Sequence, residues 1–381
     1  MNKQQSKTDL FAIFKTFLRF GFLAWGGPVA QIAMIKDELV DREKWISPDK
    51  FKRTLAVYQA LPGPEAHELC VYFGMIKAGR WGGFLAGLGF MLPGLLLMLL
   101  LSYFYAAYGA TTLLPLFAGI APAVCALIVR AAHRISTHIL HDKSMIYAGI
   151  ISIILTLFSL HFLLVFLICG IFRSLWIKNQ KAVAAIVSLA LAVLFLLVFR
   201  YAGLQFSGSK SGLFIEGLKA GMLSFGGAYT AIPFLQNSMV GNYDSITTSS
   251  FLDGIALANV IPAPLVIFGT YLGFLAGGFS GALLITAGIF LPAFSFTLVG
   301  HKQIERLIEN KTFHGSLDSV SAAVVGMLII TALQIFLHTI TTPIQTIIFT
   351  IALAGFYFLK HRLSTPAIMI CCGVFGYFVS A

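Results

Sequence analysis

Charged residues are scarce in this sequence. Only 11% of its 381 residues are Asp, Glu, Lys or Arg, whereas 58% are hydrophobic. A soluble domain of this length needs more charge to keep its surface hydrated, so the composition excludes a soluble globular protein. The chain is therefore predicted to be an integral membrane protein. Apolar runs such as Gly82 to Tyr105 and Ala182 to Phe199 reach the roughly 20 residues that span a bilayer.

The signatures of several other protein classes are also missing. The sequence has no glycine-rich phosphate loop with its Lys-Ser/Thr, no His-Glu-x-x-His and no Ser/His/Asp constellation, which argues against an ATP-driven pump or a membrane hydrolase. Its five cysteines lie in apolar runs without metal-ligand spacing, and we interpret them as small buried hydrophobes. We therefore expect no cofactor and no metal site.

Positively charged residues outnumber negatively charged ones, with 26 Lys and Arg against 15 Asp and Glu. In a chain that crosses a membrane several times, this excess indicates cytoplasmic loops rather than binding to nucleic acid. The polar stretch Met1 to Asp9 shows no removable signal peptide.

The chain contains two similar halves, related by an offset of 200 residues. Trp25-Gly26-Gly27 aligns with Phe225-Gly226-Gly227, and Pro62 and Pro64 align with Pro262 and Pro264. After a one-residue shift, a further set of glycines and a proline also match: Gly79, Gly82, Gly89 and Pro93 with Gly278, Gly281, Gly288 and Pro292. Such self-similarity indicates a tandem duplication. We predict a first repeat over 1–181, a linking transmembrane helix and connector over 182–211, and a second repeat over 212–381.

Each repeat is expected to contain two short broken segments, two spanning helices and a final pair of helices. The expected ranges are 82–104, 112–130, 145–158 and 162–175 in the first repeat, and 280–300, 316–337, 343–359 and 364–380 in the second. An odd linking helix would turn the second repeat upside down. The predicted fold class is thus an all-α polytopic membrane protein of two inverted-topology repeats with broken or re-entrant helices.

The distribution of loop charges predicts the same inversion, because Lys and Arg favour the cytoplasmic side. The loop over 36–53 is strongly basic, whereas its counterpart over 241–250 has no Lys or Arg; the asymmetry reverses at 302–311, which faces a basic-free stretch at 105–115. A cytoplasmic N-terminus leaves only Arg200, Lys210 and Lys219 of the 26 cations on the far side. Residues 10–38 and 54–77 could each be a re-entrant hairpin or a broken spanning helix, and the charges favour hairpins.

Four breaks interrupt apolar runs that otherwise favour helix. Gly frees the backbone and Pro removes an N–H group, and freed backbone at membrane depth is tolerated only where protein or a wet cavity receives it. The helix starts after these breaks offer unpaired amides and a partial positive charge, which suits an anion. The alternative is that Gly and Pro only permit close packing or a kink. The predicted substrate-binding residues of the breaks are Trp25, Gly26, Gly27, Pro28, Pro62, Gly63, Pro64, Gly226, Gly227, Pro262 and Pro264.

Polar side chains near the breaks extend this predicted site. Arg19 and Lys219 each precede a break by six residues and are candidates for binding an anion, with Arg19 favoured because its guanidinium fork matches oxyanion oxygens. Both could instead extend to opposite interfaces. Gln59 and Asn259 share the repeat offset and could donate amide N–H groups to a ligand.

Titratable residues also lie close to the breaks. Glu65, His67 and Glu68 follow the Pro-Gly-Pro motif, and Asp253 is a lone acid in an apolar segment. They are candidates for proton coupling. For Glu65 and Glu68, the simpler interpretation is that acids at a helix start complement the helix dipole.

These motifs together resemble those of the chromate ion transporter family, of the long two-domain type. The resemblance covers nearly the whole chain and lies in Phe20-Gly21 through Pro28, Trp45-Ile46-Ser47, Gln59-x-Leu61-Pro62-Gly63-Pro64 and Gly89-Phe90-x-Leu92-Pro93, with echoes at Ser224 to Gly227, Pro262 to Pro264 and Phe290-Leu291-Pro292. It implies movement of chromate across the inner membrane, usually outward and giving chromate resistance, with sulfate as a similar oxyanion.

The sequence therefore predicts a secondary transporter for a divalent oxyanion in the inner membrane, working by rocking of the two repeats. Its expected partners are chromate or a sulfate-like oxyanion and the lipid bilayer, and an oligomer is compatible with the sequence. The alternatives are an anion channel, a transporter of another small anionic solute, and a membrane enzyme or anion-lipid flippase that uses Glu65 and His67.

Overall fold

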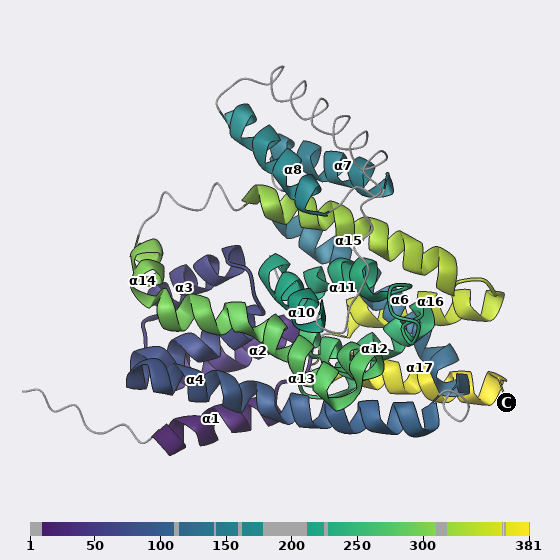
Figure 1. Ribbon diagram of the computed structural model, residues 1–381, viewed down its shortest axis with the longest axis horizontal. Helices are drawn as coiled ribbons and strands as arrows, with labels where there is room; N and C mark the ends of the chain where they lie inside the picture. Colours follow the sequence, from purple (N-terminus) through teal and green to yellow (C-terminus); the bar gives the residue numbers. More distant parts are fainter. Residues whose placement is uncertain are drawn as a thin grey trace, which may run out of the picture.

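The described part of the chain is built from α-helices (Figure 1). A computed structural model describes residues 10–109, 114–140, 142–158, 162–177, 212–224, 228–309, 318–359, 361 and 363–380. No β-strand forms among these residues. Four helical stretches are long and apolar enough to cross a membrane: Glu65–Tyr108, Pro115–Thr137, Leu265–Val299 and Ala322–Thr339. The protein is an all-α, multi-pass membrane protein.

The two halves have the same order of helices. In the first half these are α1 (Leu10–Phe22), α2 (Gly27–Ile35), η1 (Lys36–Arg42), α3 (Pro48–Ala60), α4 (Glu65–Phe104), η2 (Tyr105–Gly109), α6 (Leu114–Ile139), α7 (Lys143–Leu157) and α8 (Phe162–Ile177). In the second half they are α10 (Gly212–Leu223), η3 (Ala228–Thr230), α11 (Ala231–Met239), α12 (Thr248–Val260), η4 (Leu265–Ile267), α13 (Phe268–Val299), α14 (His301–Glu309), α15 (Asp318–Thr339), α16 (Pro343–Phe358) and α17 (Ser364–Ser380). The expected linking helix within 182–211 lies outside the described residues.

The helix ranges expected from the sequence agree closely with these elements, with one clear exception. The helix expected over 112–130 continues to Ile139 in α6. Arg134, which the expected range leaves outside the helix, therefore lies within it. The predicted helix ended at the first charged residue, Arg130, whereas α6 continues past it to Ile139.

The long elements α4 and α13 each fold back on themselves at a glycine. Ala78 and Gly79 leave the helical conformation, Gly79 with a φ of 67°, and Gly277 and Gly278 do the same, Gly278 with a φ of 65°. A Cβ atom on Gly74 would lie 2.3 Å from the carbonyl oxygen of Gly82. Such close approach of two helical arms requires glycine, so each element is a tight hairpin of a short arm and a long returning arm.

Both broken segments of the first half begin and end at the same end of the molecule. The Trp45 ring, in the loop after η1, lies 6.1 Å from the Phe73 ring and 6.4 Å from the Phe17 ring, centroid to centroid. The Lys77 ammonium group lies 4.6 Å from the same indole. Segment 48–77 therefore runs inward, breaks at 61–64 and returns, which is the hairpin arrangement that the sequence favours.

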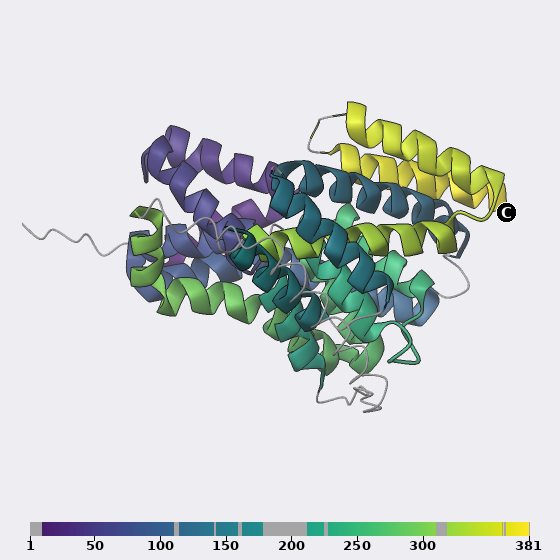
Figure 2. The same cartoon turned by 90° about the horizontal axis from the view of Figure 1, so that it is seen from above.

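The long arms of the two halves pass each other in opposite directions. Gly83 lies against Leu298 and Gly87 against Phe294, so rising residue numbers on α4 meet falling numbers on α13. The final helices pack across the halves as well. The Ser152 hydroxyl of α7 donates to the Ala323 carbonyl of α15, and Gly119 of α6 packs against Gly376 of α17. Figure 2 shows α16 and α17 lying along α6.

Candidate functional site

The first break lies between α1 and α2, and only glycine fits its backbone. Gly26 and Gly27 both have left-handed φ angles, 86° and 76°. Two consecutive residues in this region would be strained with any side chain, and Pro28 then starts α2 with the φ that a helix needs. Trp25 is half-buried beside the break. The first amides of α2 have no side-chain cap.

The second break, Leu61 to Pro64, is fully enclosed. Pro62, Gly63 and Pro64 are buried, and Gly63 has a φ of 146°. A Cβ atom there would meet Glu68 Oε1 at 2.7 Å, so the Glu68 carboxyl group packs directly on this glycine. The backbone N–H of Gly63 donates to the carbonyl of Ser224, 3.1 Å away in the second half.

The second half supplies matching residues. Ile261 to Pro264 interrupt the chain between α12 and η4 and are buried. Asn259, one turn earlier, donates its side-chain amide to the carbonyl of Ile255 in its own helix, at 2.8 Å. Gly226 and Gly227 lie outside the described residues, but Ser224 before them and Tyr229 after them are described.

The breaks of the two halves meet. The side-chain amide of Gln31, buried in α2, donates to the carbonyl of Ala24 at 2.9 Å and to that of Ala263 at 3.0 Å. The Tyr229 hydroxyl lies near Gly27, at 3.6 Å from where a Cβ would stand. Breaks of both halves therefore meet in the interior, through the hydrogen bonds from Gln31 to Ala263 and from Gly63 to Ser224. Gly26 of the first break is exposed.

Three buried titratable side chains, Glu65, His67 and Glu68, directly follow the second break. Glu65 is 7% exposed, with the Gln59 side chain within hydrogen-bonding reach, and the positive charge of Arg134 acts on its carboxylate. Glu68 is completely buried, and neither of its oxygens has a hydrogen-bond partner among the described residues. The His67 ring packs edge-on between Phe290 and Phe294 of α13, at 4.8 and 4.7 Å.

Asp253 belongs to a different environment. It is buried on α12 and accepts a hydrogen bond from the Tyr105 hydroxyl at 2.7 Å. Tyr105 directly follows the long arm of α4 and belongs to the first half of the chain.

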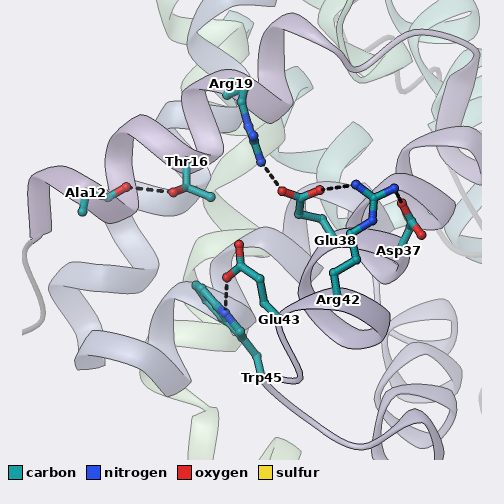
Figure 3. A network of polar contacts seen from close by, with 8 residues as sticks. All are labelled: Ala12, Thr16, Arg19, Asp37, Glu38, Arg42, Glu43 and Trp45. Carbon is teal, nitrogen blue, oxygen red and sulfur yellow. Dashed lines mark hydrogen bonds and ion pairs between the residues drawn. The ribbon is translucent and has the colours of Figure 1, made fainter.

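Arg19 and Lys219, the cations that the sequence places near the breaks, both have acidic partners. Arg19 pairs with Glu38, which also contacts Arg42 at 3.6 Å, and this network lies between α1 and η1 (Figure 3). The Arg19 side chain is 55% exposed. Lys219 pairs with Glu216 of its own helix at 2.8 Å.

Two arginines of α6 are the cations that the sequence analysis missed. Arg134 acts electrostatically on both Glu65 and Tyr229, and Arg130 acts on Tyr229. Arg130 also holds its guanidinium over the Phe356 ring, 5.9 Å from the centroid. Neither forms an ion pair within the described ranges. Both lie in the last third of a candidate membrane span that ends at Thr137, and the Arg134 side chain is exposed. A cation within such a span is a functional candidate that the sequence could have identified.

A multi-pass helical membrane protein in which broken helices from two halves meet at an interior polar cluster has the architecture of a transporter. The chain belongs to the chromate transporter family. The family's sequence model matches it twice, over residues 11–174 and 211–377, with a description that reads "Chromate transporter". The two matches begin 200 residues apart, in agreement with the offset of the repeat.

Full-length relatives support this assignment. The chain is 45% identical to a chromate transport protein of Pseudomonas aeruginosa, over 96% of this chain and 92% of the relative. It is 28% identical to a chromate transport protein of Cupriavidus metallidurans, over 94% and 90% of the two chains, and 28% identical to an uncharacterised transporter of Methanocaldococcus jannaschii, over 100% and 96%. No solved structure matches the chain.

Proposed function

We propose that the chain is a secondary transporter that carries chromate, or a similar divalent oxyanion such as sulfate, through the point where the helix breaks meet. The observation that carries this proposal is the pair of hydrogen bonds between the halves, from Gln31 to Ala263 and from Gly63 to Ser224. Helix starts at these breaks direct amides and a partial positive charge inward, which favours a doubly negative solute. Two full-length relatives named as chromate transport proteins agree with this substrate.

The proposed substrate site combines the breaks with a cation of α6. Arg134 is the proposed cation, because it has no ion-pair partner among the described residues and its charge reaches Glu65 and Tyr229, although its side chain is exposed. Arg19, Lys219, Gln59 and Asn259 remain proposed ligands, although the first two are paired with acids. The break residues complete the set: Trp25, Gly26, Gly27, Pro28, Pro62, Gly63, Pro64, Gly226, Gly227, Pro262 and Pro264.

Glu68 is the proposed site of proton coupling. A carboxyl group without any hydrogen-bond partner is costly to bury as an anion, so it needs a proton or a cation beside it. Because the Glu68 carboxyl group contacts Gly63, a change in its charge would act directly on the second break. Glu65, His67 and Asp253 are the other candidates, and no catalytic reaction is assigned to any of them.

We further propose that the protein lies in the inner membrane with a cytoplasmic N-terminus and exports its substrate. The two repeats, 1–181 and 212–381 around the link at 182–211, would have opposite orientations. The opposite directions of the long arms of α4 and α13 and the unequal loop charges support this arrangement.

Proteoliposomes test the proposal. We expect labelled chromate to enter vesicles preloaded with unlabelled chromate, and preloaded sulfate to drive the same exchange. Flux that follows only the electrochemical gradient, without counterflow, would indicate a channel. Absence of any chromate flux, with the protein correctly inserted, would refute the proposed function.

A further inference from the structure

A carboxylate of the second half is tied to two residues of the first half at one end of the molecule. Glu305 of α14 accepts a hydrogen bond from the Tyr72 hydroxyl at 2.8 Å and pairs with the Lys50 ammonium group at 3.0 Å. Tyr72 lies on the short arm of α4, and Lys50 lies on α3. We name this set the Tyr72 cluster; it fastens the helix that follows α13 to the first half.

A second set makes the reciprocal connection. Tyr105, directly after the long arm of α4, donates to Asp253 of α12 at 2.7 Å, and its ring packs edge-on against Tyr271 of α13 at 5.1 Å. Asp253 and Tyr271 are both buried. We name this set the Tyr105 cluster; it fastens the end of α4 to the second half.

The two clusters occupy equivalent places in the duplicated fold. Residues 105 and 305 share the offset of 200, and Tyr72 corresponds to Tyr271 after the one-residue shift that also relates Gly79 to Gly278. In both clusters, a tyrosine on a short hairpin arm contacts the segment that follows the long arm of the other half. The acidic residue comes from a different element in each cluster. It is Glu305 of α14 in the Tyr72 cluster and Asp253 of α12 in the Tyr105 cluster.

The clusters lie at opposite ends of the molecule, with the helix breaks between them. Figure 1 shows α3 and α14 side by side at one end, and α12 with the end of α4 towards the other. Tyr72 lies beside residues 83 to 87 of the long arm, so the rest of that arm separates the two clusters by about 30 Å at 1.5 Å per residue. A solute bound at the breaks would pass one cluster on each side.

We propose that the Tyr72 and Tyr105 clusters are the two gates of the transport path, opened in turn. This inference rests on the proposed transport function. Each cluster joins the two halves through side-chain hydrogen bonds and, in one case, an ion pair, so a rocking of the halves must break one set while the other holds. A hydrogen bond of this kind contributes about 1 kcal/mol, which keeps a gate shut without preventing its opening. The present structure, with both sets formed, corresponds to a state that is closed at both ends.

Cross-linking tests the gates through transport. The pairs Lys50→Cys with Glu305→Cys and Tyr105→Cys with Tyr271→Cys, each in a background free of the five native cysteines, would be joined by a bifunctional thiol reagent with a reducible spacer. We expect either cross-link to lower chromate counterflow at least tenfold, and reduction to restore it. The pair Asp49→Cys with Lys52→Cys is the matched control, because these residues form an ion pair within α3 and their cross-link stays within that helix. Undiminished counterflow with either gate cross-linked would overturn the inference.

Thiol accessibility tests the gates without any assumption about the substrate. Asn259→Cys, in a background free of the native cysteines, places one thiol beside the last break. Its labelling by a membrane-impermeant reagent reports the side of the membrane from which the break is accessible. Tyr72→Phe and Tyr105→Phe remove only a hydroxyl group, and we expect them to raise labelling about fivefold from opposite sides of the membrane. Labelling that changes from the same side in both variants, or in neither, would refute the gates. Failure of the transport proposal would instead appear as absent chromate flux in the unmodified protein.

Discussion

Gln31 of α2 donates a hydrogen bond to the carbonyl of Ala263, 3.0 Å away, and so connects the first helix break to the last. Its second donor N–H reaches the carbonyl of Ala24 at 2.9 Å. Both carbonyls belong to backbone that the breaks release from helical hydrogen bonding. One buried amide side chain therefore satisfies freed backbone groups of both halves, which is the condition for interrupting a helix inside a membrane.

Replacement of Gln31 by Leu should destabilise the protein by about 1 to 3 kcal/mol, because it leaves two buried carbonyls without a partner. The measurement is thermal unfolding in detergent, followed by intrinsic fluorescence. Asn259→Leu is the matched control, since the Asn259 amide bonds only to a carbonyl of its own helix and should cost less. Equal losses in the two variants would show that Gln31 does not hold the breaks together.

The glycines at the hairpin turns provide a test of backbone strain alone. Gly79 and Gly278 have positive φ angles, yet a Cβ atom at either would meet nothing within 4 Å. Gly79→Ala and Gly278→Ala should each cost about 2 kcal/mol, because a positive φ combined with an extended ψ is a region that essentially only glycine occupies. Asn should give no recovery, because it tolerates the left-handed helical region but not this one.

The glycines inside the hairpins should behave differently. Gly74→Ala and Gly273→Ala would place a Cβ atom 2.3 and 2.5 Å from a backbone carbonyl oxygen of the facing arm, so the arms must separate. We expect a loss of about 3 kcal/mol, at the upper end of overpacking effects. Asn should give no recovery at either position. A smaller loss than at Gly79 would contradict the close packing of the two arms.

Much of this arrangement could be predicted from the sequence, because glycine and proline report directly on the backbone. The doubled Gly26-Gly27 and the Pro62-Gly63-Pro64 motif locate breaks that the structure contains, and the offset of the repeat predicts that the second half follows the same plan. The positions of most helix ends could be predicted as well, because polar residues bound the apolar runs that form the helices.

Tertiary partners could not be predicted in the same way. The helix expected over 112–130 stops short of Arg134, because the sequence does not show how far α6 continues past its first charge. The acidic partner of Arg19 lies 19 residues away on η1, and no local pattern identifies Glu38 among the acids of that segment. Contacts such as Tyr105 with Asp253 join residues 148 apart and depend on how the two halves pack.

Asp142 allows a prediction of pH dependence outside the membrane-spanning helices. Partial burial tends to raise the pKa of its carboxyl group, but hydrogen bonds from Ser144 and Met145 and the nearby Arg173 guanidinium outweigh burial and hold that pKa below its usual 3.8. A carboxyl group with a lowered folded-state pKa stabilises the fold above its unfolded pKa of about 3.9, and this contribution disappears as the pH falls through the folded value.

Asp142→Asn should therefore lower stability at pH 7 by about 1 kcal/mol or less, since the partly exposed ion pair is screened by solvent. The difference from the unmodified protein should shrink towards pH 3, because the unfolded-state carboxyl group is protonated below a pKa of about 3.9 whereas the folded one takes up its proton only at lower pH. Asp142→Ala should cost more, because it also removes the cap of α7. Melting temperatures in detergent at the two pH values provide the measurement, and a constant difference would contradict the lowered pKa.

The last prediction separates the two arginines that could hold the substrate. Arg134→Gln should lower the initial rate of chromate uptake, at subsaturating chromate, about tenfold or more, because a charge-assisted hydrogen bond contributes about 1.5 to 3 kcal/mol. Arg19→Gln should have a smaller effect, since Glu38 already balances the Arg19 charge. Arg53→Gln on the exposed face of α3 is the control for a general loss of positive charge. Arg134→Lys should retain part of the rate, because an ammonium group keeps the charge without the guanidinium fork. Should Arg19→Gln abolish uptake while Arg134→Gln leaves it intact, the substrate would lie beside α1 and not at the meeting point of the breaks.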